Sequence, residues 1–243
     1  MISMISIFFV GGAASGFTGS LLSTLILTGV ILLGVLLTLA MSKFLSKTVL
    51  KGVPSSFTLE LPPYRRPQFG KVIIRSLLDR TVFVLGRAVV VAAPAGLVIW
   101  LLANITAGEA SLLAHCAAFL DPVGKLFGLD GTILFAFILG FPANEIVLPI
   151  MLMTYMATGT LTEMSDLTAL RELLVANGWT WVTALCVIVF SLVHWPCSTT
   201  CLSIKKESKS LKWTAVGILL PTVSGFALCF IIATFARVCG FLT

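Results

Sequence analysis

The feature that most constrains this chain is its series of long apolar segments separated by short charged loops. Of its 243 residues, 58% are hydrophobic and only 11% are charged, and the mean hydropathy is +1.08. A typical soluble domain carries about a quarter charged residues. Because a helix of about 20 apolar residues crosses a bilayer, the chain is predicted to be an all-α polytopic membrane protein with about four to six membrane segments.

Positive charges lie in the loops that flank the apolar segments. The run at 21–41 is followed by a basic stretch at 42–81, whose first three basic residues are lysines. The positive-inside rule places this stretch in the cytoplasm. Further apolar segments lie at 82–103, 132–157, 179–203 and 213–235. The bases form no long run and no basic-aromatic array, so we expect the lipid bilayer, and not nucleic acid, as a partner.

Counting the crossings exposes a conflict. If every apolar segment crossed, the lysine-rich loop at 205–212 would lie outside, against the positive-inside rule. The conflict disappears if one proline-interrupted segment enters and leaves on the same side. We expect 132–157 to be this re-entrant segment, with 179–203 as the alternative.

Both interrupted segments carry a proline followed by polar side chains, at Pro142 and at Pro196. Proline removes a backbone donor and clashes with the preceding turn, so these helices are predicted to break there. The carbonyl groups released at a break can bind an ion if they face protein. Paired broken helices are a strong indicator of a transport site.

Glu145 is the residue in the first break that most needs an explanation. An acidic side chain at the centre of a span costs about 2.5 to 3.5 kcal/mol. It could form a structural pair with Arg87, or bond a freed carbonyl as a protonated acid. The functional alternative is that Glu145 and Asn144 supply oxygen ligands on a cation path.

The second break carries softer donors. Cys197 and Cys201 are four residues apart, so on a helix that begins at Pro196 their sulfurs share one face, with His194 just before the break. Thiol and imidazole donors suit Fe(II), Zn(II) or Cu(I) better than Na(I) or Mg(II). Simple packing is the alternative role for these cysteines. The predicted metal-site residues are Cys197, Glu145, Asn144, Cys201 and His194.

Three stretches resemble the ferrous iron transport protein B family. They are Glu-Leu-Pro-Pro-Tyr-Arg-Arg-Pro at 60–67, Gly-Phe-Pro-Ala-Asn-Glu-Ile-Val-Leu-Pro at 140–149, and His-Trp-Pro-Cys-Ser-Thr-Thr at 194–200, with Ile-Lys-Lys-Glu after it at 204–207. The resemblance implies the C-terminal membrane portion of the family, with the second of its two Gate modules. On that basis the Pro-Cys of the gate falls on Cys197, and the Pro-Ala-Asn-Glu element falls on Asn144 and Glu145.

The resemblance also implies a layout and a setting. It divides the chain into an N-terminal membrane segment at 1–52, a cytoplasmic basic loop with a surface helix at 53–81, and a Gate-type transmembrane module at 82–239. It implies Fe(II) as the transported substrate, no tightly bound cofactor, and a multi-pass location in the bacterial inner membrane. The family's GTPase domain and first Gate module are absent from these residues, so we expect no enzymatic activity.

The predicted function is therefore the C-terminal transmembrane part of a ferrous iron importer, which forms half of the Fe(II) permeation path. The expected partner is the N-terminal GTPase and first-Gate half of the transporter, if that half is separately encoded; assembly as a homo-oligomer stays open. Two alternatives remain. One is a non-transporting assembly subunit or relic of a split transporter. The other is a Gate-type transporter for an organic solute such as a nucleoside.

Overall fold

The structure, a computed structural model, describes residues 2–9, 17–48, 81–108, 110–161, 163–164 and 166–240, together with Gly70 and Ile74. The motif at 60–67 and most of the predicted basic loop with its surface helix lie outside the described residues. The side chain of Arg87 also lies outside them, so its predicted pairing with Glu145 stays a prediction.

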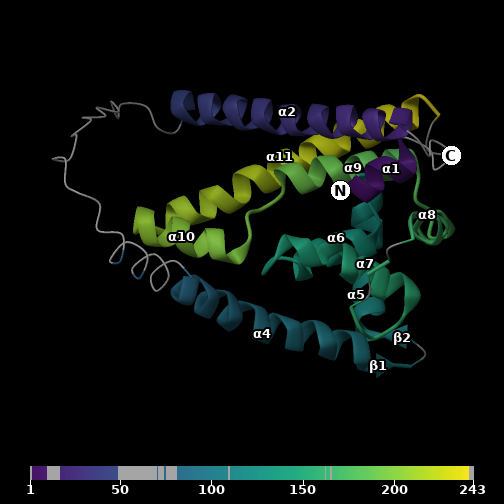
Figure 1. The fold of residues 1–243 in the computed structure, drawn as a ribbon, viewed down its shortest axis with the longest axis horizontal. Helices are drawn as coiled ribbons and strands as arrows, with labels where there is room; N and C mark the ends of the chain where they lie inside the picture. Colours follow the sequence, from purple (N-terminus) through teal and green to yellow (C-terminus); the bar gives the residue numbers. More distant parts are fainter. Residues whose placement is uncertain are drawn as a thin grey trace. The chain divides into compact units, whose positions relative to one another are not determined.

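The described chain is almost entirely helical (Figure 1). The elements, in chain order, are α1 (Ile2–Phe8), α2 (Phe17–Thr48), α4 (Phe83–Asn104), β1 (Thr106–Ala107), β2 (Ala110–Ser111), α5 (Leu112–Leu126), α6 (Gly131–Leu139), η2 (Asn144–Ile146), α7 (Val147–Met156), α8 (Leu167–Ala176), α9 (Trp181–Val193), α10 (Ser198–Ser208) and α11 (Leu211–Val238). The two strands form one short antiparallel pair. The predicted all-α fold is confirmed.

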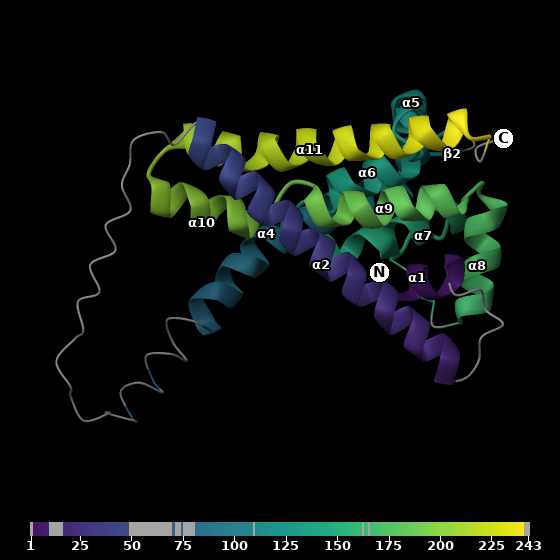
Figure 2. The same ribbon diagram turned by 90° about the horizontal axis from the view of Figure 1, so that it is seen from above.

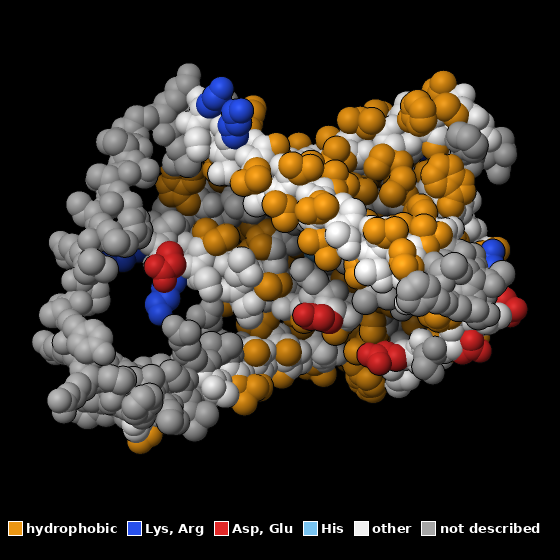
Figure 3. All heavy atoms as spheres, turned by 45° about the horizontal axis from the view of Figure 1, so that its top comes forward, with side chains coloured by type: hydrophobic (Ala, Val, Ile, Leu, Met, Phe, Trp, Pro, Cys, Tyr) orange, Lys and Arg blue, Asp and Glu red, His pale blue; other side chains and the backbone are white. Residues whose placement is uncertain are grey.

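Several segments are long and apolar enough to cross a membrane. Among the described residues these are Gly19–Lys47, Trp181–Ser208 and Leu211–Val238, and α5 with α6 forms a further candidate that is bent by 111°. Large apolar side chains are exposed on the helices, for example Leu36 at 63% and Phe235 at 68%. Hydrophobic side chains cover much of the helical surface seen in Figure 3. Such a surface suits acyl chains, and the chain is a multi-pass membrane protein.

The chain divides into two compact units, residues 28–89 and residues 1–27 with 90–243. The smaller unit contains most of α2, in which the Thr38 hydroxyl donates to the Gly34 carbonyl at 2.8 Å. This bond keeps the hydroxyl satisfied within its own helix, as a lipid environment requires. The larger unit contains both predicted breaks. The domain boundaries at 52 and 81 stay a prediction.

α9 and α11 pack as an antiparallel pair in the larger unit, and they lie side by side in both views (Figures 1 and 2). The ring centroids of Phe190 and Phe226 are 4.9 Å apart, and Cys229 Sγ lies 3.4 Å from the Cys186 carbonyl oxygen. Both cysteines are fully buried. They fill the helix interface, which agrees with a packing role for them.

α6 and α7 double back on each other as a hairpin. At its base, Asp130 caps α6 by accepting from the Ile133 amide at 2.6 Å, and the Tyr155 hydroxyl at the end of α7 donates to the same carboxylate. Trp179 Nε1 donates to the Tyr155 hydroxyl at 2.8 Å, which joins the base to the start of α9. A hairpin is the arrangement expected for a segment that enters and leaves on one side, as predicted for 132–157.

The hairpin base is also joined to the end of α4. Asn104 Nδ2 donates to the Gly159 carbonyl at 2.9 Å, just after α7 ends. The N-terminal helix α1 packs against α8 and α9, and the rings of Phe8 and Trp179 stack with centroids 6.1 Å apart. The start of α9, the end of α7 and the end of α4 therefore lie at the same end of the larger unit.

Candidate functional site

The two predicted breaks meet in space. α6 ends at Gly140, and the chain continues through η2 into α7; α9 ends at His194, and α10 begins after Cys197. The Ser198 amide donates to the Phe141 carbonyl at 2.9 Å, and the Ser198 hydroxyl lies 3.4 Å from the Pro142 carbonyl oxygen. The first amide of a helix has no partner in its own helix, so each break satisfies backbone groups that the other leaves free.

This contact changes one expectation. We expected the carbonyls released at the first break to be available to an ion. The Phe141 carbonyl instead accepts from the Ser198 amide. For the carbonyls that precede Phe141, binding of an ion stays a prediction.

Gly140 allows the hairpin to turn sharply at its tip. A Cβ atom at this position would collide with Cγ2 of Val147 and would lie 3.0 Å from the Ala136 carbonyl oxygen. A side chain here would force the Val147 side chain to move, so glycine lets the tip pack closely against the first residue of α7. The sharp turn brings Asn144 and Glu145 to the junction.

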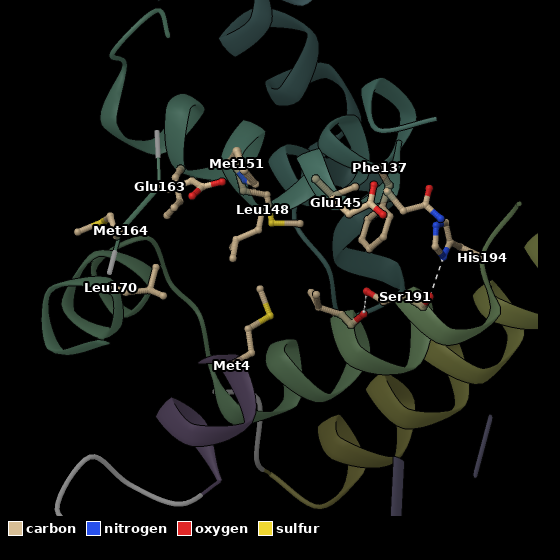
Figure 4. Close-up of a pocket in the computed structure, with 15 residues that line it drawn as sticks. Met4, Phe137, Glu145, Leu148, Met151, Glu163, Met164, Leu170, Ser191 and His194 are labelled. Carbon is tan, nitrogen blue, oxygen red and sulfur yellow. Dashed lines mark hydrogen bonds between the residues drawn. The ribbon is translucent and has the colours of Figure 1, made fainter. Parts of the chain in front are cut away.

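A cavity of about 510 Å³ opens beside the junction. Asn144 and Glu145 line it from η2, while Ser191 and His194 line it from the end of α9. Figure 4 shows Glu145 and His194 near each other on one side of this cavity. The structure thus brings three of the five predicted site residues, Asn144, Glu145 and His194, to a single cavity.

His194 is held with one ring nitrogen facing protein carbonyls. Its Nδ1 lies 3.1 Å from the Phe190 carbonyl oxygen and 3.0 Å from that of Ser191. Carbonyl oxygens only accept, so Nδ1 carries the proton and the neutral ring keeps its lone pair on Nε2. Nε2 is buried and has no hydrogen-bond partner among the described residues. A histidine that ligates a metal commonly donates its other ring N–H to a carbonyl oxygen in this way.

Aromatic rings surround His194 and limit its rotation. The ring centroids of Phe137, Trp195 and Phe190 lie 5.1, 5.8 and 5.9 Å from that of the imidazole. Packing of this kind fixes the direction in which Nε2 points.

The two cysteines lie on the adjoining turn of α10 and do not line the cavity. Cys197 is the N-cap residue of α10, and its Sγ lies 3.1 Å from Thr199 Oγ1 and 3.2 Å from Thr200 Oγ1. Cys201 is buried, with its Sγ 3.5 Å from the Pro196 carbonyl oxygen. In the part of the chain that the structure describes, no three His, Cys, Asp or Glu side chains gather closely enough to hold a metal ion. The cysteines and the cavity residues are neighbours, but they do not form one ready-made metal centre.

The cavity also has residues that sequence reasoning did not select. Glu163 and Met164, in the segment between α7 and α8, line it together with Met151 and Met4. Glu163 lies in a polar stretch without a motif, and Met4 comes from the other end of the chain. No local pattern could have placed either residue at this cavity.

Two family models match the chain. The model described as ferrous iron transport protein B C terminus covers residues 27–79, and the Gate model, described as nucleoside recognition, covers residues 75–211, which is more than half of the chain. No solved structure matches the chain.

Curated relatives give the same family. A protein of Staphylococcus aureus (strain MSSA476) named Fe(2+) transporter FeoB is 29% identical over 219 residues, which are 86% of this chain and 31% of the relative. Proteins of the same name from Synechocystis sp. and Leptospira biflexa are 28% and 24% identical over 72% and 89% of this chain, and over 28% and 34% of their own lengths.

The chain thus spans about a third of the length of the relatives it matches. The matched residues include both helix breaks and the segment that precedes them. The chain belongs to the ferrous iron transport protein B family and corresponds to its C-terminal membrane portion, with a Gate module.

Proposed function

We propose that this chain is the C-terminal transmembrane part of a ferrous iron importer of the bacterial inner membrane and forms half of its Fe(II) path. One observation carries the proposal: two broken segments meet at a cavity that a carboxylate, an amide and an unpartnered imidazole nitrogen line together. The relatives are named Fe(2+) transporter FeoB, which supports the choice of cation.

The donor set suits a divalent cation of intermediate hardness, such as Fe(II). Imidazole nitrogen and carboxylate oxygen both bind Fe(II), and His194 Nε2 is already oriented with its lone pair free. Glu145 supplies the negative charge that offsets the cost of bringing a divalent cation into a low-dielectric region. Conduction requires binding that is weak enough to reverse, so an incomplete ligand set is suited to a path.

Cys197 lies next to the cavity and is the next proposed ligand. It lies one residue before Ser198, whose amide joins the two breaks, and its thiol lies at the N-terminus of α10. We assign Cys197 as the soft ligand that Fe(II) meets on leaving the cavity, with Cys201 beside it. The N-terminal GTPase and first-Gate half is the proposed partner that completes the path.

Uptake of radioactive Fe(II) tests the proposal. The chain is expressed with its N-terminal half in bacterial cells that lack other ferrous importers. Glu145→Gln and His194→Asn each remove one cavity donor and are expected to lower the initial rate by about tenfold or more, the equivalent of about 1.4 kcal/mol. Glu207→Gln, an exposed carboxylate on α10, is the matched control and keeps the wild-type rate.

Membrane abundance is measured for each variant, so that loss of protein is not read as loss of transport. Wild-type rates in both Glu145→Gln and His194→Asn would reject the cavity as part of the path.

The description of the Gate model, nucleoside recognition, favours a second candidate, the transport of an organic solute. The same cells distinguish the two. If nucleosides are taken up and Fe(II) is not, or if excess nucleoside competes with Fe(II), the organic-solute function is correct.

A further inference from the structure

The cavity is larger than the binding of one Fe(II) ion by Glu145 and His194 requires. In Figure 4 Glu145 and His194 lie at one end, Glu163 and Met164 lie at the other, and Leu148 and Met151 lie between them. One cavity of about 510 Å³ includes all of these residues. A divalent cation with six waters occupies about 180 Å³, at about 30 Å³ for each water, so the cavity can hold a hydrated ion at more than one position.

The distribution of charge identifies the end that faces outward. α10 and the following loop carry the basic side chains Lys205, Lys206, Lys209 and Lys212, which the positive-inside rule assigns to the cytoplasm. At the opposite end of the larger unit, the described acidic side chains Asp121, Asp130, Glu163, Asp166 and Glu172 outnumber the basic side chains Lys125, Arg171 and Arg237.

Glu163 belongs to the outward end. It follows Gly159, which accepts from Asn104 at the end of α4, and precedes α8, which packs against α1. The side chains of Glu163 and Glu145 are both exposed at the two ends of the cavity, whereas its middle is lined by the buried side chains of Met4 and Met151. A cation that arrives from outside would therefore meet Glu163 before Glu145.

The chemistry of the lining agrees with this order. Among the described residues that line the cavity, Glu145 and Glu163 are the ones that carry a formal charge. Between them the walls are apolar and include the thioether side chains of Met4 and Met151, and Met164 adds a third thioether beside Glu163. Thioethers are soft donors that bind Mg(II) and Ca(II) poorly, so the stretch between the two carboxylates favours a transition-metal cation.

We propose that Glu163, with Met164 beside it, forms an outer capture station for the divalent cation, from which the ion passes to the inner station of Glu145 and His194. This inference rests on the proposed function and adds a residue and a direction to it. Permeation paths commonly contain several weak sites, because each site must release the ion to the next.

Uptake kinetics of Glu163→Gln test the capture station. Loss of a charged contact at the entrance is expected to raise the KM for Fe(II) about tenfold, while Vmax changes by less than about twofold, because the inner station is intact. Glu163→Asp keeps the charge and restores most of the affinity. Glu172→Gln, an exposed carboxylate on the neighbouring α8 that does not line the cavity, keeps the wild-type KM.

The dependence of KM on ionic strength distinguishes charge capture from a purely structural role of Glu163, because a structural role would leave it unchanged. Capture by an exposed charge weakens as the Debye length shortens, so the KM ratio between Glu163→Gln and wild type falls toward one as the ionic strength rises.

The outcomes separate this inference from the proposed function. If wild type takes up Fe(II) but Glu163→Gln keeps the wild-type KM, or loses Vmax alone, the capture station is wrong and the importer stands. If the wild-type assembly takes up no Fe(II), the proposed function itself fails.

Discussion

A proline interrupts the helix at both breaks, but the two breaks carry different donor atoms. The first lies at the tip of the α6–α7 hairpin, where Asn144 and Glu145 are exposed and offer oxygen donors. The second interrupts the Trp181–Ser208 segment, where His194 is partly buried and Cys201 is buried, and they offer nitrogen and sulfur. Each break carries a proline and polar neighbours, so the difference arises from what surrounds each one.

The surroundings decide which donors are tolerable. The hairpin tip is bonded to the second break through Ser198, but the side chains of Asn144 and Glu145 beside it are exposed. A carboxylate there keeps access to water or an ion. A break within a long segment is packed by neighbouring helices, as the aromatic rings around His194 show, and that position favours side chains with a small desolvation cost. The Ser198 contact therefore joins a break that offers oxygen donors to one that offers nitrogen and sulfur.

The largest expected effect comes from releasing the hairpin base. Asp130→Ala removes the cap of α6 and the acceptor of the Tyr155 hydroxyl, and is expected to cost about 3 kcal/mol of stability. The measurement is thermal unfolding of the purified protein in detergent, together with Fe(II) uptake. Asp130→Asn keeps the cap and an acceptor and should lose much less.

A matched control for Asp130 lies at α8. Asp166 caps that helix from an exposed position by accepting from the Thr168 amide at 2.8 Å, so Asp166→Ala should cost about 1 kcal/mol or less. Equal losses in the Asp130→Ala and Asp166→Ala variants would show that the base does not anchor the first break.

A smaller effect is expected from filling the hairpin tip. Gly140→Ala places a Cβ against Val147 and should cost about 2 kcal/mol. Val147→Ala removes the colliding Cγ2, so the double variant should regain part of the stability that Gly140→Ala loses. Thermal unfolding of the four proteins in this cycle gives the coupling, and additive effects would argue against the tight turn.

The smallest expected effect comes from cutting the link between the breaks. Ser198→Pro removes the amide that donates to Phe141. Proline is well tolerated at the first position of a helix, and Cys197 already has the extended backbone, ψ 161°, that a residue before proline needs. We expect a loss of about 1 kcal/mol.

The uptake of Fe(II) by Ser198→Pro sharpens the comparison. If the two breaks act together, transport falls more than stability does. Ser198→Ala keeps the amide and serves as the control. Unchanged transport in Ser198→Pro would mean that the breaks work independently.

Much of this architecture could be predicted from the chain alone. The apolar runs at 21–41, 179–203 and 213–235 predicted three of the candidate spans, whereas the bent pair α5–α6 was not predicted. Pro142 and Pro196 predicted the positions of both breaks, because proline acts on its own helix whatever the surroundings. The conflict in the charged loops predicted a re-entrant segment at 132–157; α6 and α7 pack together there, and its entry and exit on one side of the membrane stay a prediction. The selection of Glu145, Asn144 and His194 needed only residue type and proximity to a break.

Other features depend on contacts between distant residues. The Phe141 carbonyl is occupied by Ser198, from more than fifty residues away, and the cysteines lie beside the cavity rather than in it. Glu163 has no motif, and Met4 reaches the cavity only because α1 packs against α8 and α9.

The sequence by itself determined three things: the chain is a membrane protein, its helices break at Pro142 and Pro196, and particular donor residues lie at each break. It could do so because hydropathy and proline geometry are local properties. The tertiary structure alone decided which donors face the same space and which nitrogen of His194 is free. Those outcomes depend on how the hairpin, α9 and α10 pack, and packing is a property of residues far apart in the chain.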